Sequence, residues 1–141
     1  MNIGVNLLSV FLAALVSMVV GFVYYSPMVL GKPWMKEMGL SSENLKKAQK
    51  EMGKLYGLSF VLAMVSAYIL SHVMAFSMNF YGYGAVMTGL TSGFWMWLGF
   101  VMPSQATDQI FGGKNWKLLA INTGYQLTSL LAMGLTLGYL Y

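Results

Sequence analysis

The chain has no cysteine, no arginine, four acidic residues and one histidine among its 141 residues. The absence of cysteine excludes disulfides, thiolate metal ligands and cysteine nucleophiles. The absence of arginine removes the side chain best suited to phosphate and base recognition, so nucleic acid is not an expected partner. No hydrolase, nucleotide-binding or metalloprotease motif occurs in the sequence. We therefore expect no enzyme activity, no cofactor and no metal site.

Charge is missing from three long stretches of the chain. No charged residue occurs in residues 1–31, 55–107 or 118–141, which hold 31, 53 and 24 residues. A membrane-spanning helix needs about 20 apolar residues, so these stretches accommodate one, two and one spans. The sequence predicts one all-α transmembrane domain over residues 1–141. We expect a polytopic four-helix bundle with spans near residues 5–25, 55–76, 84–103 and 118–139.

The eight lysines lie in two segments that four spans place on one side of the membrane. Six occur from Lys32 to Lys54, and the others are Lys114 and Lys117. Positively charged loops face the cytoplasm. This predicts a multi-pass protein of the inner cell membrane with both termini outside, a cytoplasmic elbow and helix at residues 26–54, and a cytoplasmic loop at residues 104–117. The helix after Ser42 is expected to run unbroken into the second span.

Two features of the cytoplasmic segments suggest contacts with the bilayer. Lysines on the helix before the second span form either a solvated face or a patch for anionic lipid: Lys46, Lys47, Lys50 and Lys54. Aromatic, turn-forming and basic residues predict an inner elbow and interfacial anchor: Tyr25, Ser26, Pro27, Lys32, Trp34, Lys114 and Trp116. A weak repeat relates the residues that follow Gly21 to those that follow Gly99, which predicts two duplicated hairpins.

Small residues recur at every fourth position in all four predicted spans. Helices in lipid associate through close backbone approach at such positions, which predicts a tightly packed bundle. The glycines expected in these contacts are Gly89, Gly93, Gly134 and Gly138. Because the small-residue positions exceed the needs of one bundle, we also expect a homo-oligomer.

Few polar residues fall where they could serve a function inside the membrane. A polar path through the second half of the chain would be lined by Asp108, Asn122, Gln126 and Trp95. The alternatives are an inner-face ion pair or cap for Asp108 and hydrogen bonds between helices for the two amides. His72, near the outer end of the second span, is either a hydrogen-bonded interfacial residue or an outer proton or ligand site.

Three sequence blocks resemble the small four-span membrane proteins grouped as domain of unknown function 1761. The blocks are YYSP at 24–27 with GKPWMK at 31–36, WLGFVMP at 97–103, and INTGYQL at 121–127 with MG at 133–134. The resemblance implies a four-span membrane protein without an assigned activity. The family pattern has histidine where this chain has Gln126, so the resemblance does not imply a titrating group there.

Two functions are compatible with these observations. The first is a homo-oligomer that moves or senses a small solute or ion along the polar faces of the third and fourth spans. The second is an accessory or structural protein that packs against a larger membrane complex, which the scarcity of ionisable groups favours.

Overall fold

A computed structural model describes residues 5–113 and 115–141, and every regular element among them is helical. In chain order the elements are α1 (Leu7–Tyr24), α2 (Gly31–Glu37), α3 (Ser42–Gln49), α4 (Met52–Tyr81), α5 (Ala85–Met96), the π-helical turn η1 (Trp97–Val101), α6 (Met102–Gly112) and α7 (Trp116–Tyr139). The prediction of an all-α chain is confirmed. In the described chain, three helical stretches are long and apolar enough to cross a membrane: α1, α4 and the continuous α5–η1–α6.

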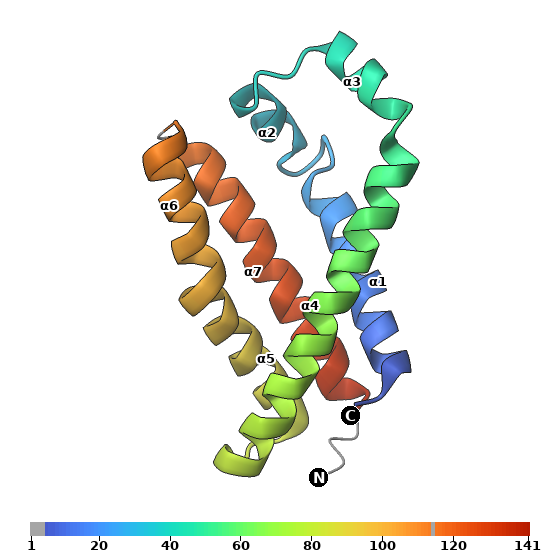
Figure 1. Ribbon diagram of the computed structural model, residues 1–141, viewed down its shortest axis with the longest axis vertical. Helices are drawn as coiled ribbons and strands as arrows, with labels where there is room; N and C mark the ends of the chain where they lie inside the picture. The colour runs from blue at the N-terminus through green and yellow to red at the C-terminus, as the bar shows by residue number, and fades with distance from the viewer. Residues whose placement is uncertain (1–4, 114) are drawn as a thin grey trace.

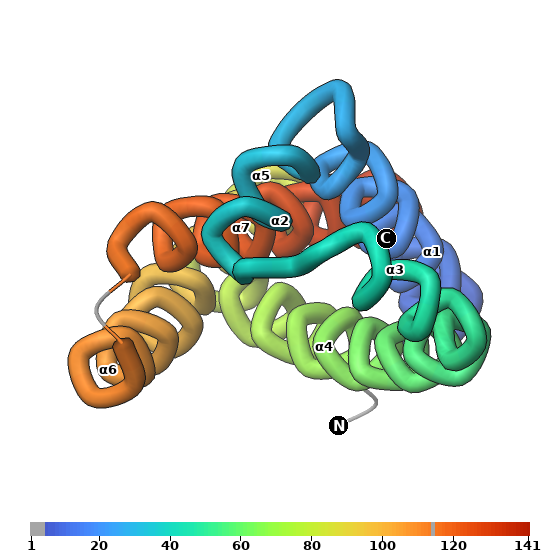
Figure 2. Tube along the Cα trace, turned by 90° about the horizontal axis from the view of Figure 1, so that it is seen from above, coloured from blue at the N-terminus to red at the C-terminus, as the bar shows by residue number. Residues whose placement is uncertain are grey.

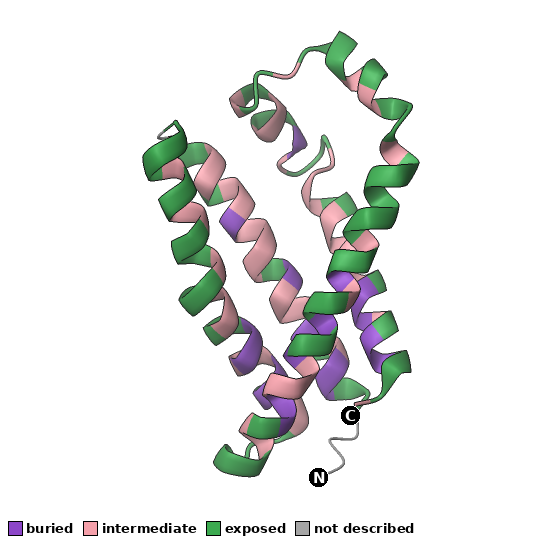
Figure 3. Cartoon of the chain, in the orientation of Figure 1, coloured by how far each residue is buried: buried purple, intermediate pink, exposed green. Residues whose placement is uncertain are grey.

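Helices α1, α4, α5 and α7 pack in pairs around a common core. α5 lies on α7, α7 on α1, α1 on α4, and α4 on α5 (Figure 1). Most buried residues lie toward the end where α1 begins and α7 ends (Figure 3). The centre of this core consists of Val10, Ala13, Ala67, Leu70 and Met74. Toward the other end α4 moves away from α6 and α7, and the exposed fraction of the side chains rises.

Glycines set the closest contact in the core. A Cβ on Gly134 would collide with the backbone oxygen of Gly89, and a Cβ on Gly89 with that of Gly134. A Cβ on Gly93 would lie 2.7 Å from the Leu130 oxygen, and one on Gly138 would lie 2.6 Å from Val86 Cα. The four glycines that the sequence singled out therefore all lie in the α5–α7 contact of a single chain.

Buried hydroxyl groups join α1 to α7. The Ser17 and Ser129 hydroxyls hydrogen-bond at 2.7 Å in the interior, and the Ser9 hydroxyl donates to the Leu140 carbonyl oxygen at 3.2 Å. Hydrogen bonds of this kind between membrane helices contribute roughly 0.6–2 kcal/mol each. They fix the position of α7 relative to α1 at the middle of their contact and at the end where α1 begins.

The third predicted span is longer than the sequence analysis expected, because the helix does not end at Pro103. The Met102 N–H donates to the Trp97 carbonyl, five residues earlier, which gives the wider turn of a π-helix. A proline inside a helix removes one N–H donor and crowds the preceding turn, and a wider turn relieves this crowding. The chain then continues as α6 to Gly112, so residues 104–112, expected to be a loop, are helical.

The first connection also differs from the expected elbow and continuous helix. The chain turns at residues 25–30, forms α2, and ends it with Gly39 at φ +65°. The hydroxyl of Ser41, not Ser42, caps α3, and a break at Lys50–Glu51 separates α3 from α4. The two segments of the predicted repeat thus differ locally, because the first leads into a turn and the second into a helix.

The lysine-rich helix α3, the end of α6 and the start of α7 lie at one end of the molecule (Figure 1). α1 begins and α7 ends at the opposite end. Viewed from above, α2 lies across α7, with which it is in contact (Figure 2). Lys114 lies outside the described residues.

The Gly89–Gly134 contact predicts opposite effects for two glycine substitutions. Gly134→Ala should lower the free energy of unfolding by about 1–3 kcal/mol, because the α5 and α7 backbones must separate. Gly99→Ala is the matched control: it lies in η1 of the same continuous helix as Gly89, with no atom near its added Cβ, and should raise stability by up to about 1 kcal/mol. Reversible unfolding in mixed micelles measures both. Equal effects from the two substitutions would contradict this packing.

Candidate functional site

A polar cavity of about 350 Å³ opens at the end where the helices diverge. Three segments line it: the elbow of residues 25–30, α6 and α7. The lining residues are Tyr25, Gln105, Asp108, Gln109, Leu119, Asn122, Tyr125 and Gln126. All of them except Leu119 carry a polar side chain, which is unusual in helices as apolar as these.

The elbow is a tight turn held by backbone hydrogen bonds. The Leu30 N–H donates to the Tyr24 oxygen at 3.1 Å, and the Gly31 N–H donates to the Ser26 oxygen at 2.9 Å. A Cβ on Gly31 would collide with the Tyr25 carbonyl and lie 2.7 Å from the Ser26 oxygen, so only glycine fits there. The turn directs α2 back toward α7 and leaves Tyr25 at the cavity wall.

Tyr25 connects the elbow to α7. Its hydroxyl donates to Asn122 Oδ1 at 3.1 Å, and its ring centroid lies 5.0 Å from that of Tyr125. Trp34 of α2 packs on the other side of Tyr25, with 5.3 Å between ring centroids. Two predicted anchor residues, Tyr25 and Trp34, thus form an aromatic layer over the cavity.

Tyr24 occupies the space beside this layer. Its hydroxyl donates to the Ile121 carbonyl oxygen at 3.0 Å. A Cβ on Gly124 would lie 2.6 Å from the Tyr24 hydroxyl, and one on Gly21 would lie 3.2 Å from the Tyr125 hydroxyl. Glycines on α1 and α7 therefore make room for the tyrosine of the opposite helix.

Asn115 joins three helices at the opening of the cavity. Its side-chain oxygen caps α7 by accepting from the Leu118 N–H at 3.0 Å, and its amide nitrogen donates to the Glu37 carboxylate of α2 at 3.1 Å. Its backbone N–H donates to Gln109 Oε1 of α6 at 3.3 Å. These bonds fix α2, α6 and α7 relative to one another without any contact to the cavity centre.

One buried polar atom of the cavity wall has no partner in the described structure. Gln105 Oε1 is buried and accepts no hydrogen bond. A buried carbonyl without a donor costs roughly 1–3 kcal/mol, so native proteins rarely retain one without a reason such as a bound water or ligand.

Three of the four predicted path residues meet in this cavity. Asp108 lies on α6, and Asn122 and Gln126 lie on α7. Trp95 does not line it: its side chain is 64 % exposed on α5, packed edge-on against Phe94. The reason is that α6 and not α5 lines the cavity, and Trp95 lies in α5, before η1.

The other predicted positions lie away from the cavity lining. His72 Nδ1 lies 2.9 Å from the Tyr68 carbonyl oxygen within α4, and the centroids of the two rings lie 4.4 Å apart with the rings tilted by 59°. Lys32 and Trp116 are exposed, while Pro27 lies in the elbow next to Ser26. His72 thus has the environment of a locally hydrogen-bonded residue.

The sequence analysis missed three polar lining residues, Gln105, Gln109 and Tyr125, and the apolar Leu119. Gln105, Asp108 and Gln109 have the i, i+3, i+4 spacing of one helical face. This signal was present in the sequence, but it becomes visible only if the helix is continued past Pro103.

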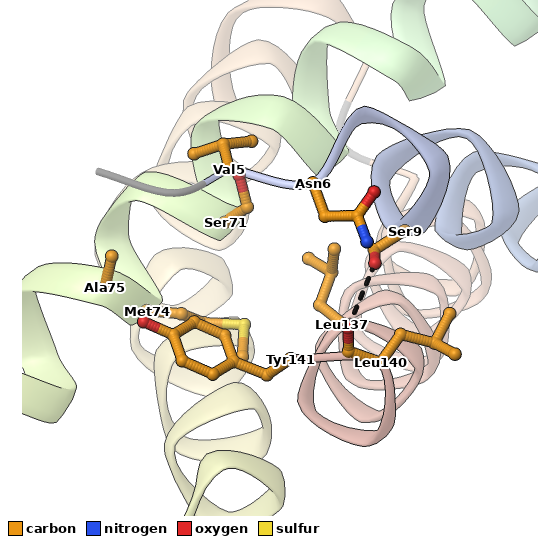
Figure 4. A pocket seen from close by; sticks show the side chains of 9 residues that line it. All are labelled: Val5, Asn6, Ser9, Ser71, Met74, Ala75, Leu137, Leu140 and Tyr141. Atoms are coloured by element: carbon orange, nitrogen blue, oxygen red, sulfur yellow. Dashed lines mark hydrogen bonds between the residues drawn. The ribbon is translucent and has the colours of Figure 1, made fainter. Parts of the chain in front are cut away.

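A larger cavity of about 430 Å³ lies at the opposite end, near the start of α1 and the end of α7 (Figure 4). Figure 4 shows Ser9 directed at the Leu140 carbonyl, with Met74 and Tyr141 across the space. Its lining has no charged residue and is largely apolar, so the smaller cavity is the better candidate for specific binding.

Comparison with known proteins identifies the family but no activity. No curated protein and no solved structure matches the chain. A family model described as "Protein of unknown function (DUF1761)" matches residues 8–138, nearly the whole chain. The resemblance seen in the sequence blocks is confirmed, and the chain belongs to the DUF1761 family.

Proposed function

We propose that this is an integral membrane protein that binds a small solute or ion in the cavity between α6, α7 and the elbow, and moves it or senses it. One observation carries the proposal: Asp108, Asn122 and Gln126, from two helices, meet Tyr25 of a third segment in one cavity. Convergent polar groups around a cavity are what a specific ligand requires.

The interior beyond this cavity is closed. The bonded pair Ser17 and Ser129 lies one turn beyond Gln126, followed by the buried Met133 and Leu137. Leu137 already lines the cavity at the opposite end. The eleven residues from Gln126 to Leu137 correspond to about 16 Å of helix. Transport therefore requires the α1–α7 contact to open at Ser17–Ser129, whereas sensing requires only binding.

We propose that α7 is the fourth span and that α1, α4, α5–α6 and α7 form a four-helix bundle with both termini outside. α7 is the most polar of the four, but its 24 residues measure about 36 Å, enough for a bilayer core of about 30 Å. Its packing against both α1 and α5 supports this placement, since these two helices would surround it in the membrane.

We also propose that the protein forms a homo-oligomer. Gly53 and Gly57 of α4 are exposed, and no atom lies near either position, so another helix could approach closely there. The same surface favours the alternative of an accessory subunit in a larger membrane complex. Native mass spectrometry of protein gently extracted from its own membrane should show a defined homo-oligomer. A stoichiometric complex with a different protein would favour the accessory role.

Substitutions in the cavity should reduce flux or ligand response in reconstituted vesicles. Asp108→Asn and Asn122→Ala should each reduce it by about 10-fold or more, because the first removes the carboxylate of the lining and the second removes the acceptor of the Tyr25 hydroxyl. Glu43→Gln on α3 and Asn79→Ala on α4 are matched controls on exposed residues. A wild-type protein that conducts or responds, together with four unaffected variants, would rule out this cavity as the site.

The proposed topology is testable because the chain contains no cysteine. A single introduced cysteine is then the only thiol that a reagent can label. A membrane-impermeant maleimide should label Glu43→Cys only from the inner side of oriented vesicles. Tyr81→Cys and Tyr141→Cys should be labelled only from the outer side. Labelling of position 141 from the same side as position 43 would show that α7 does not cross the membrane.

A further inference from the structure

We propose that the cavity binds a small organic monocation, a protonated primary amine with a short apolar body. This inference rests on the proposed function and names the ligand class of the same site. Three properties of the cavity lead to it: its charge, its hydrogen-bonding groups and its aromatic wall.

The charge of the lining is that of a single carboxylate. Asp108 is the only acidic lining residue, and none of the described lining residues is basic. Lys32 and Lys36 of the neighbouring α2 are exposed to solvent and line no part of the cavity. A ligand of charge +1 neutralises Asp108, whereas an anion would meet a carboxylate with no lining cation to offset it.

The cavity offers acceptors to a cation, beside the N–H donors of its four amide side chains. Gln105 Oε1 is buried without a donor, and Asp108 can only accept when it is ionised. Asn122 Oδ1 already accepts from the Tyr25 hydroxyl, and this carbonyl oxygen retains a second lone pair. A primary ammonium group has three N–H donors and no acceptor, so it can donate to the Asp108 carboxylate and to these amide oxygens.

The remaining wall suits the body of an organic ligand. Tyr25 and Tyr125 lie 5.0 Å apart and tilted by 56°, and aromatic rings of this kind attract cations to their faces. Leu119 adds an apolar surface. A volume of about 350 Å³ is on the order of ten water molecules, at about 30 Å³ for each water. A bare alkali ion would leave most of that space to water.

The experiment uses ligands of nearly equal shape that differ in charge. Butylammonium, butanol and butyrate are titrated into the full chain in lipid nanodiscs at pH 7 and constant ionic strength, and binding is followed by calorimetry. An alkylamine is protonated at this pH, as a lysine side chain is. Butylammonium should bind at least about 10-fold more tightly than the other two, since hydrogen bonds to charged groups have this effect.

Two variants locate the bound amine. Asp108→Asn should weaken butylammonium binding by about 10-fold or more and leave the melting temperature of the ligand-free protein close to that of the wild type. Gln105→Leu should raise this melting temperature, because it removes the buried oxygen without a partner, and should still weaken butylammonium binding. A variant that is more stable but binds butylammonium more weakly has lost a ligand contact, because a purely structural role for Gln105 would not weaken binding in a stabilised protein.

Two further probes test the need for N–H donors and for an organic body. Butyltrimethylammonium should bind more weakly than butylammonium to the wild type, and Gln105→Leu should reduce that difference. Sodium or potassium chloride alone should produce no saturable stabilisation that depends on Asp108. An Asp108-dependent response to either alkali ion without butylammonium binding would overturn the organic class.

The outcomes separate this inference from the function on which it rests. Preferred binding of butanol or butyrate, abolished by Asn122→Ala, would overturn the cationic class and leave the cavity as a binding site. Butylammonium binding that is insensitive to both Asp108→Asn and Gln105→Leu would overturn the assignment to this cavity. Absence of binding by all probes, together with flux or response unaffected by the cavity variants, would overturn both proposals.

Discussion

The direct backbone contact between Gly89 and Gly134 is the constraint on which the arrangement of the helices depends. It brings α5 and α7 as close as two helices can approach, because any side chain at either position would meet the opposite backbone. α7 is thereby held at the centre, where its other side packs on α1 through the Ser17–Ser129 hydrogen bond. In a chain with so little charge, close packing and single hydroxyl pairs replace the hydrophobic driving force that organises a soluble core.

The cavity follows from the fact that this close contact involves only one end of the bundle. Beyond it α4 separates from α6 and α7, and the space is lined by polar residues of α6 and α7 instead of filled with aliphatic side chains. The elbow contributes Tyr25, bonded to Asn122, to one side of this space, and α2 is joined to α7 through Glu37 and Asn115. The helices therefore pack tightly at one end of the bundle, and their separation at the other end leaves the polar cavity.

The sequence predicted the helical class and three residues of the cavity lining, because both depend on local patterns. Asn122 and Gln126 share one face of a helix by spacing alone, and Asp108 stood out as the only acid outside the first loop. The π-turn before Pro103 could not be derived in this way, since it depends on how neighbouring helices accept the widened turn. Without it Gln105 and Gln109 appeared to lie in a loop. The exposure of Trp95 and the Glu37–Asn115 bond depend on tertiary contacts that no periodicity encodes.

The central claim is that water and solutes reach Asn122 from one side of the membrane and meet a closed core beyond it. The most direct test is the reaction of Asn122→Cys with a small water-soluble thiol reagent in oriented vesicles, with Met133→Cys as the buried reference. The account predicts that position 122 reacts from the inner side only and that position 133 reacts from neither side. Failure of position 122 to react from either side would contradict the account, because the polar residues of α6 and α7 would then be packed against each other without an accessible cavity.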